Sequence, residues 1–264
     1  MARFTQLLAG VAGAALLLAG CTSTSTPTDP DDPLGLIEAG TLTICSEVPY
    51  EPFEYQDENS PTGYSGFDMD LIAEIASRMG LEIKIVESEF DALASGASLE
   101  AGSCDMAASA MTITPERQVH IDFSTPYYDS TQSLLVKKDS GYETLADLAG
   151  KIIGVQMGTT GESYAEENLP EGAITQSFQG NPGMVLALES NQVDALLQDL
   201  PVNERNVSLN PDFVIIEIYD TEEQYGFAYA KGQYAELQSR VNALLAELKA
   251  DGTYDAIFAK YFID

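Results

Sequence analysis

A threonine and an arginine five residues apart, Thr112 and Arg117, follow a run of small residues in the stretch AASAMTITPER at positions 107–117. A strand that ends near Ala110 would leave free backbone N–H groups, a hydroxyl and a guanidinium directed at one point. Arginine offers a planar, two-pronged donor to a carboxylate, and the hydroxyl and backbone N–H groups can complete its hydrogen bonds. The stretch therefore indicates a carboxylate receptor, although an arginine after a turn can instead be a solvated surface charge.

The elements that must position this receptor follow from the hydrophobic pattern of the first half of the chain. Apolar residues recur every four positions over 67–79 and predict a helix that Gly80 ends, and a weaker helix is predicted over 91–101. Three short runs between and around them are predicted to be strands: 41–45, 81–86 and 105–110. Alternating strands and helices are typical of a parallel sheet with crossover helices, so the fold class is α/β.

Polar and aromatic residues follow each of these three strands. Glu47 and Tyr50 lie in a loop after the first strand, Phe90 follows the second, and the receptor residues follow the third. In such sheets ligands bind beyond the carboxyl ends of the strands, so we expect these side chains to meet at one edge.

The second half of the chain repeats the pattern. Predicted strands cover 132–136, 151–155, 174–178, 193–197, 213–218 and 224–229, and predicted helices cover 162–168, 184–189 and a C-terminal region. Gln156, Thr159 and Thr160 follow one strand and Asp199 follows another. Asp199 could be a site residue, or it could cap the helix that begins near Pro201.

Composition narrows the function. The chain has 264 residues, enough for one large domain or two small ones, and a net charge of −30 that excludes nucleic acid as a partner. The only histidine, His120, has no cysteine or serine partner for a catalytic triad, and no His/Cys cluster has metal-ligand spacing. We therefore predict no catalytic residue, no metal and no cofactor.

The N-terminus is predicted to be a secretion signal over residues 1–20, with an apolar stretch too short to anchor the chain by itself. Leu18-Ala19-Gly20-Cys21 resembles the bacterial lipobox, whose cysteine is acylated and becomes the first mature residue; the alternative is an ordinary signal peptide with an incidental cysteine. Residues 21–36 are rich in Ser, Thr, Pro and Asp and are predicted to be a disordered, lipid-anchored linker.

Two further cysteines, Cys45 and Cys104, would face an oxidising environment outside the cell. In the predicted register, Cys45 lies near the exit of the first strand and Cys104 near the entrance of the third. That separation favours two free thiols over a disulfide, and the pairing stays open.

The motif GFDMDL at residues 66–71, with Ile75, Ala76 and Met79, resembles the signature of the family-3 extracellular solute-binding proteins. The resemblance continues through residues 111–117, 122–124, 127–128, 154–160, Asp199 and 248–254. It implies a type II periplasmic-binding-protein fold, with two parallel-rich sheets joined by two crossover strands. The implied lobes are residues 37–130 plus 228–264 and residues 131–227.

The resemblance also implies roles for single residues. Arg117 would hold a ligand carboxylate, helped by Thr112 and the backbone at Ala110 and Met111, and by the loop residues Thr159 and Thr160 of the other lobe. Asp199 would take the ligand ammonium, Tyr50 and Phe90 would sandwich the ligand, and Glu47 and Gln156 would face its side chain. The implied partners are an amino acid, the permease and ATPase of an ABC importer, and the outer face of the cell membrane. The protein would act as a monomer.

Glu47 bears on which amino acid is bound, because a second negative charge in a closed cleft would repel an acidic side chain. We predict arginine or another basic amino acid, with glutamine or another neutral polar amino acid as the alternative; Glu47 could also point to solvent. A rival of another class is an exported cyclohexadienyl-type dehydratase, with Glu47 and Asp199 as acid and base.

Overall fold

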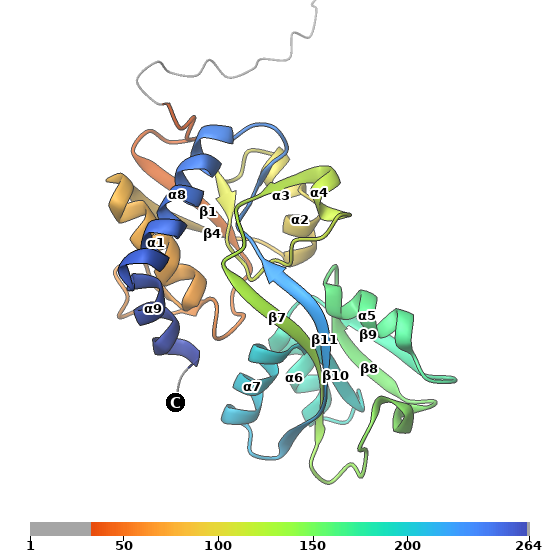
Figure 1. Ribbon diagram of the computed structural model, residues 1–264. Helices are drawn as coiled ribbons and strands as arrows, with labels where there is room; N and C mark the ends of the chain where they lie inside the picture. The colour runs from red at the N-terminus through yellow and green to blue at the C-terminus, as the bar shows by residue number, and fades with distance from the viewer. Residues whose placement is uncertain (1–32, 263–264) are drawn as a thin grey trace, which may run out of the picture.

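The computed structural model describes residues 33–262, which form two lobes, each built on a five-stranded sheet (Figure 1). The first sheet has the order β4-β1-β5-β12-β6 and the second the order β11-β7-β10-β8-β9. Each sheet contains three parallel strands and two that run antiparallel to their neighbours. The predicted α/β fold with two parallel-rich sheets is confirmed.

The first lobe carries the N-terminal strands and both ends of the described chain. Its sheet consists of β1 (Thr41–Ser46), β4 (Glu82–Glu87), β5 (Met106–Ala107), β6 (Ile121–Phe123) and β12 (Ala228–Ala230). Its helices are α1 (Phe67–Met79), α2 (Phe90–Ala94), α3 (Ala97–Glu100), α4 (Arg117–His120), α8 (Ala235–Asp251) and α9 (Thr253–Phe262). A small hairpin pairs β2 (Tyr55–Gln56) with β3 (Tyr64–Ser65).

The second lobe repeats this arrangement. Its sheet consists of β7 (Tyr128–Lys137), β8 (Ile152–Gln156), β9 (Ile174–Phe178), β10 (Ala195–Asp199) and β11 (Phe213–Tyr225). Its helices are α5 (Thr160–Asn168), α6 (Asn181–Glu189), α7 (Leu200–Leu209) and the 3₁₀ helix η1 (Leu145–Leu148).

Two antiparallel strands, β7 and β11, connect the lobes (Figure 1). Their register runs from Phe213 opposite Lys137 to Tyr225 opposite Tyr128, with an irregularity between Tyr219 and Glu223. The sequence predicted two strands over 213–218 and 224–229, but a single strand spans most of this region. The intervening residues are mostly polar, which hides their pairing from a hydrophobicity pattern.

The helix predicted over 91–101 is two short helices, α2 and α3. Gly96 between them has a φ of 84°, the left-handed conformation that glycine adopts without strain, and a Cβ there would lie 2.8 Å from Ile121 Cγ2. The segment after the second predicted strand therefore differs slightly from the prediction, because Phe90 is the first residue of α2 and not a loop residue.

The third strand is shorter than predicted, and this explains an error about the cysteines. Only Met106 and Ala107 pair with β1, so Cys104 precedes the ladder and lies over the face of the sheet that α2 and α3 cover. The Asp105 carboxylate, which accepts the Thr43 N–H at 2.7 Å, fixes this approach of the chain. Cys45 and Cys104 form a disulfide with Cα atoms 5.6 Å apart, and the register estimate of their separation was wrong.

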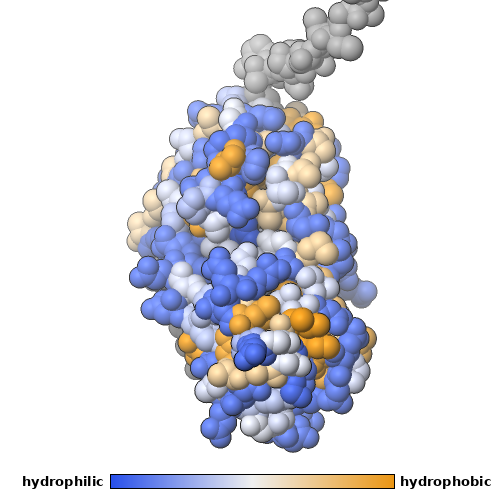
Figure 2. Space-filling view, turned by 90° about the vertical axis from the view of Figure 1, so that its right-hand side faces the viewer, coloured by the Kyte–Doolittle hydropathy of each residue, from blue (hydrophilic) through white to orange (hydrophobic). Residues whose placement is uncertain are grey.

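The described residues contain no helix long and apolar enough to cross a membrane. Figure 2 shows a mostly hydrophilic face, with apolar surface gathered in its lower half, over the second lobe. The predicted signal, lipobox and most of the linker lie outside the described residues.

Candidate ligand-binding site

Nine of the eleven residues predicted for the site line one narrow pocket between the lobes. Tyr50, Phe90, Ala110, Thr112 and Arg117 come from segments beyond the strands of the first sheet. Gln156, Thr159, Thr160 and Asp199 come from the second lobe. Side chains that are up to 149 positions apart in the sequence, such as Tyr50 and Asp199, are in hydrogen-bond contact here.

Arg117 is buried at the centre of this pocket, with 7% of its surface exposed. Its guanidinium donates to the Thr112 carbonyl at 2.7 Å and to the Gly158 carbonyl of the other lobe at 2.9 Å. Its Cζ lies 5.2 Å from the centre of the Phe90 ring. Burial lowers the pKa of Arg117, but a guanidinium stays charged at neutral pH, so the pocket holds a fixed positive charge.

The backbone beside Arg117 is held in an uncommon conformation. Ala110 has a φ of 45°, which costs a non-glycine residue about 1–3 kcal/mol, and its N–H donates to the Asp68 carboxylate at 2.9 Å. Tyr127 donates to the same carboxylate at 2.7 Å. Burial raises the pKa of Asp68 to about 7. The other acidic residue of the motif at residues 66–71, Asp70, forms an ion pair with Lys260, whereas Asp68 orients the receptor backbone.

Asp199 supplies the opposite charge from the second lobe. It is the N-cap residue of α7, but its side chain makes no capping hydrogen bond, so the helix-cap alternative does not account for it. Its carboxylate accepts from the Tyr50 hydroxyl at 3.0 Å, from Gln132 Nε2 at 2.5 Å and from the Tyr225 hydroxyl. Burial, and then the nearby Glu223 charge, raise the pKa of Asp199 to about 6.

Glu47 lies at one end of the site and is 7% exposed, which contradicts the alternative that it points to solvent. It does not line the central pocket; it lines an adjoining groove between the lobes, together with Glu87, Glu89 and residues 178–183. Burial raises the pKa of Glu47 to about 7, although a hydrogen bond with Gln156 opposes the shift. Glu47 also meets the second lobe closely, because a Cβ on Gly180 would lie 2.7 Å from its Oε1.

Met111, like Glu47, does not line the pocket, whereas Thr159 does. Met111 is buried in the core of the first lobe outside the pocket lining, and its carbonyl accepts the Gly226 N–H at 3.0 Å. Thr159 lines the pocket as the N-cap of α5, where its hydroxyl accepts the Glu162 N–H at 3.1 Å. The cap takes up the Glu162 N–H, so the N–H groups of Thr160 and Gly161, which precede it in the first turn, are the ones placed to bind an anion.

Three residues on the crossing strands also belong to the site, and the sequence did not indicate them. Gln132 and Tyr225 bond to Asp199, and Glu223 accepts hydrogen bonds from the Thr112 hydroxyl at 2.6 Å and the Thr160 hydroxyl at 2.8 Å. Their burial is apparent only in the structure, because Glu223 lies between the two strands predicted over 213–218 and 224–229.

The described part of the chain contains no group of three or more His, Cys, Asp or Glu side chains placed to hold a metal ion. His120 is exposed on α4, away from the pocket lining. The pocket therefore offers charges and hydrogen bonds from the protein's own side chains: one guanidinium, one carboxylate opposite it, and aromatic walls between them.

The chain is similar in sequence to known proteins. The family described as bacterial extracellular solute-binding proteins, family 3, matches residues 42–264. A probable histidine-binding protein of Campylobacter jejuni is 36% identical over 259 residues, 96% of each chain. The arginine-binding extracellular protein ArtP of Bacillus subtilis is 32% identical over 223 residues, 84% of this chain and 86% of ArtP.

A solved structure shows the same fold. The crystal structure of the ancestral amino acid-binding protein AncCDT-1, a precursor of cyclohexadienyl dehydratase, superposes with a TM-score of 0.76 at 37% identity. The match covers 84% of this chain and 96% of the ancestral protein.

Proposed function

This chain belongs to the bacterial extracellular solute-binding proteins of family 3, and we propose that it captures a polar amino acid between its lobes for an ABC importer. The observation that carries this proposal is the placement of Arg117 and Asp199, opposite charges from different lobes, in the lining of one pocket. An α-amino acid buried in a closed cleft must have both of its charges paired, because an unpaired buried charge costs about 3–5 kcal/mol.

Each group then has a specific role. Arg117 holds the ligand carboxylate with backbone N–H groups at Thr112 and at the first turn of α5, which begins at Thr160. Asp199 accepts the ligand ammonium. Tyr50 and Phe90 pack against the apolar part of the ligand, and its side chain extends along Gln156 toward Glu47.

Arginine or another basic amino acid is the best candidate for the ligand. Glu47 is a buried carboxylate in the groove that adjoins the pocket, hydrogen-bonded to Gln156 of the pocket lining; a cationic side chain that reaches it would gain a charge partner, and an acidic one would be repelled. Relatives named as histidine-binding and arginine-binding proteins are in keeping with this assignment. Glutamine or another neutral polar amino acid is the second candidate, since Gln156 and a protonated Glu47 could both hydrogen-bond an amide.

Thermal-shift screening of the full chain against the twenty amino acids tests the proposal. A ligand at a hundred times its Kd stabilises the folded state by about 2.7 kcal/mol, which raises the Tm of a protein of this size by about 5–10 °C. We expect the Tm to rise with arginine or, if arginine is not the ligand, with lysine, histidine or glutamine. A rise with glutamate or aspartate alone would contradict the assignment of Glu47, and no rise with any amino acid would refute the binding function.

We propose binding without catalysis, although Glu47 and Asp199 are also the two carboxyl groups that a dehydratase would use as acid and base. Incubation with prephenate and arogenate separates the two functions. Product formation that disappears in Asp199→Asn would establish the enzyme, and unchanged substrate together with amino-acid binding supports the importer role.

We further propose that Cys21 is acylated and tethers a monomeric protein to the outer face of the cell membrane, where it meets the permease and ATPase of its importer. The position of Cys21 directly after the apolar stretch at residues 7–18 supports this. We expect wild-type protein to partition into detergent and Cys21→Ser to remain unprocessed or to be released. Equal membrane-bound fractions of processed protein in both would contradict the anchor.

A further inference from the structure

Glu223 is a buried carboxylate on β11 whose hydrogen bonds reach both lobes and the other crossing strand. Its Oε2 accepts from Thr112 of the first lobe at 2.6 Å and from Thr160 of the second lobe at 2.8 Å. Its Oε1 accepts from Gln132 Nε2 on the other crossing strand at 2.9 Å and from the Thr221 hydroxyl at 2.9 Å. Only 8% of Glu223 is exposed, so these four donors replace nearly all of its hydration.

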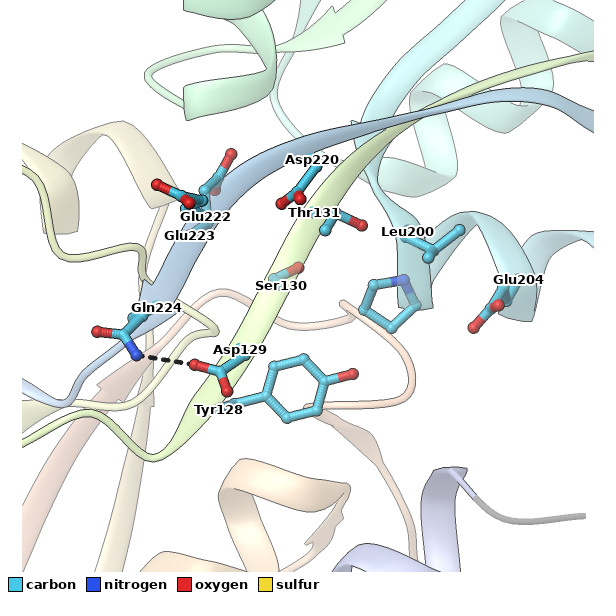
Figure 3. A pocket seen from close by; sticks show the side chains of 11 residues that line it. Tyr128, Asp129, Ser130, Thr131, Leu200, Glu204, Asp220, Glu222, Glu223 and Gln224 are labelled. Atoms are coloured by element: carbon cyan, nitrogen blue, oxygen red, sulfur yellow. Dashed lines mark hydrogen bonds between the residues drawn. The ribbon is translucent and has the colours of Figure 1, made fainter.

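The neighbouring residue shows how specific this arrangement is. Figure 3 shows Glu222 and Glu223 next to each other on β11, among the residues that line a second pocket, formed by β7, β11 and the start of α7. Glu222 has the same side chain and is exposed, whereas the side chain of Glu223 is buried among its donors. The charge is thus available at both positions, but only Glu223 touches residues of both lobes.

The bonds to Glu223 determine what the two threonines can offer a ligand. A hydroxyl has one proton, and in both Thr112 and Thr160 that proton is donated to Glu223. Neither hydroxyl can at the same time donate to a ligand carboxylate, which must take its bonds from Arg117 and from backbone N–H groups. The expectation that the Thr112 hydroxyl completes the carboxylate receptor therefore needs revision.

The same bonds cross the cleft. Thr112 and Thr160 belong to different lobes, and their hydroxyl oxygens, which bond to the same carboxylate oxygen, lie 3.5 Å apart. Opening the lobes would separate the threonines and break at least one charge-assisted hydrogen bond, of the stronger class in proteins. Since Gln132 joins Glu223 to Asp199, the junction also reaches the ammonium acceptor.

We propose that Glu223 is a positioning residue that holds the lobes closed around a bound amino acid by accepting the hydroxyl protons of Thr112 and Thr160. It does not touch the ligand; it fixes the rotamers of the two threonines and links their lobes at the hinge. The proposal rests on the amino-acid-binding function proposed above. It predicts that losing the carboxylate accelerates ligand release and leaves association almost unchanged, because encounter takes place in the open form.

The test compares Glu223→Gln with Glu222→Gln, which makes the same change of charge one residue away at an exposed position. Full-length protein in detergent micelles is titrated with L-arginine, or with whichever amino acid the screen identifies, by calorimetry, and dissociation is followed by stopped-flow tyrosine fluorescence. For Glu223→Gln we expect an increase in Kd of about tenfold, carried by koff, with kon within about twofold of wild type. Glu222→Gln should match wild type.

A double-mutant cycle with Thr160→Val separates positioning from general support of the fold. If Glu223 acts through Thr160, the double variant should lose about as much affinity as the more affected single variant, whereas independent roles would multiply the two losses. If Glu223→Gln does not fold, Thr112→Val and Thr160→Val should each raise koff in its place.

Opposite results have distinct meanings. Two results would overturn the proposed role of Glu223 while leaving the binding function intact. One is a folded Glu223→Gln with wild-type Kd and koff, and the other is losses of affinity that multiply in the double-mutant cycle. A loss carried by kon alone would overturn it as well. Wild-type protein that binds none of the twenty amino acids would refute the binding function, and with it the proposed role of Glu223.

Discussion

Replacing Glu47 by Gln removes one negative charge and keeps nearly the same shape at the side-chain end of the pocket. Glu47 is buried, and its pKa is about 7, so at pH 8 about nine-tenths of the protein carries the charge. If a basic ligand pairs with this carboxylate, the substitution leaves a buried cation without its partner, which costs about 2–5 kcal/mol. We therefore expect L-arginine to bind Glu47→Gln about 30-fold more weakly or worse at pH 8.

The pH dependence gives an independent measure of the same interaction. Because the pKa of Glu47 is about 7, binding a cation beside it at lower pH must expel a proton. The affinity for arginine should therefore fall about tenfold between pH 8 and pH 6. Protonation of Asp199, whose pKa is about 6, should lower the affinity by about a further factor of two over the same range. Wild-type protein should thus lose about 20-fold in arginine affinity over this range, and Glu47→Gln only about twofold.

The stability of the free protein should change in the opposite direction, which provides a control. Burial raises the pKa of Glu47 from 4.5 to about 7, so the folded state binds its proton more tightly than the unfolded chain does. The contribution of Glu47 to the free energy of unfolding is therefore most favourable below pH 4.5 and is lost as the pH rises to about 7. Acidification from pH 7 to 5 should stabilise free wild-type protein relative to Glu47→Gln.

Isothermal calorimetry at pH 6, 7 and 8 with arginine and glutamine measures the affinities, and urea denaturation of the free proteins at pH 5 and 7 measures the stabilities. Glutamine serves as the matched ligand, since it carries the same ammonium and carboxylate and no side-chain charge. Arginine affinity that stays within twofold in Glu47→Gln, or an unchanged pH slope, would show that Glu47 does not pair with the ligand.

Three other substitutions test separate parts of the structure. Arg117→Ala should weaken every amino-acid ligand by about 2–5 kcal/mol while thermal unfolding shows a folded protein, and calorimetric affinity equal to wild type would exclude its role as the carboxylate partner. Gly180→Ala places a methyl group 2.7 Å from Glu47 Oε1, so it should reduce affinity about tenfold without lowering the Tm; unaltered binding would mean that the lobes do not approach this closely. Replacing both Cys45 and Cys104 by Ser opens a loop with a sequence separation of 59, which should lower the free energy of unfolding by about 4 kcal/mol, measured by urea denaturation; a loss below about 1 kcal/mol would contradict this.

The sequence predicted those parts of the fold in which one segment determines its own structure. The helix over 67–79 agrees with α1 at both ends, since its apolar residues recur with helical period and Gly80 ends it. The strand at 174–178 agrees with β9 in the same way. Nine site residues meet at one pocket because strand ends in an α/β sheet converge, which is a property of the fold class.

Features that depend on contacts between distant segments were not predictable in this way. The pairing of Cys45 with Cys104 depends on how the chain enters β5, and Asp105 sets that path by bonding to another strand. Glu223 and Gln132 belong to the site because two crossing strands pass behind it, and no local pattern distinguishes them from other polar strand residues. Their assignment required the three-dimensional arrangement.

The polar groups of the pocket are already bonded to each other, and this makes ligand binding an exchange of partners. Arg117 donates to two neutral carbonyls, and Asp199 accepts from two neutral hydroxyls and an amide. A ligand that brings only neutral groups replaces these bonds with others of equal strength and gains little. A zwitterion replaces neutral partners with oppositely charged ones, which adds a charge–charge attraction at each end of the ligand. We therefore expect the pocket to discriminate against amides and esters of amino acids, which keep the ammonium but lose the carboxylate, even where their shape fits.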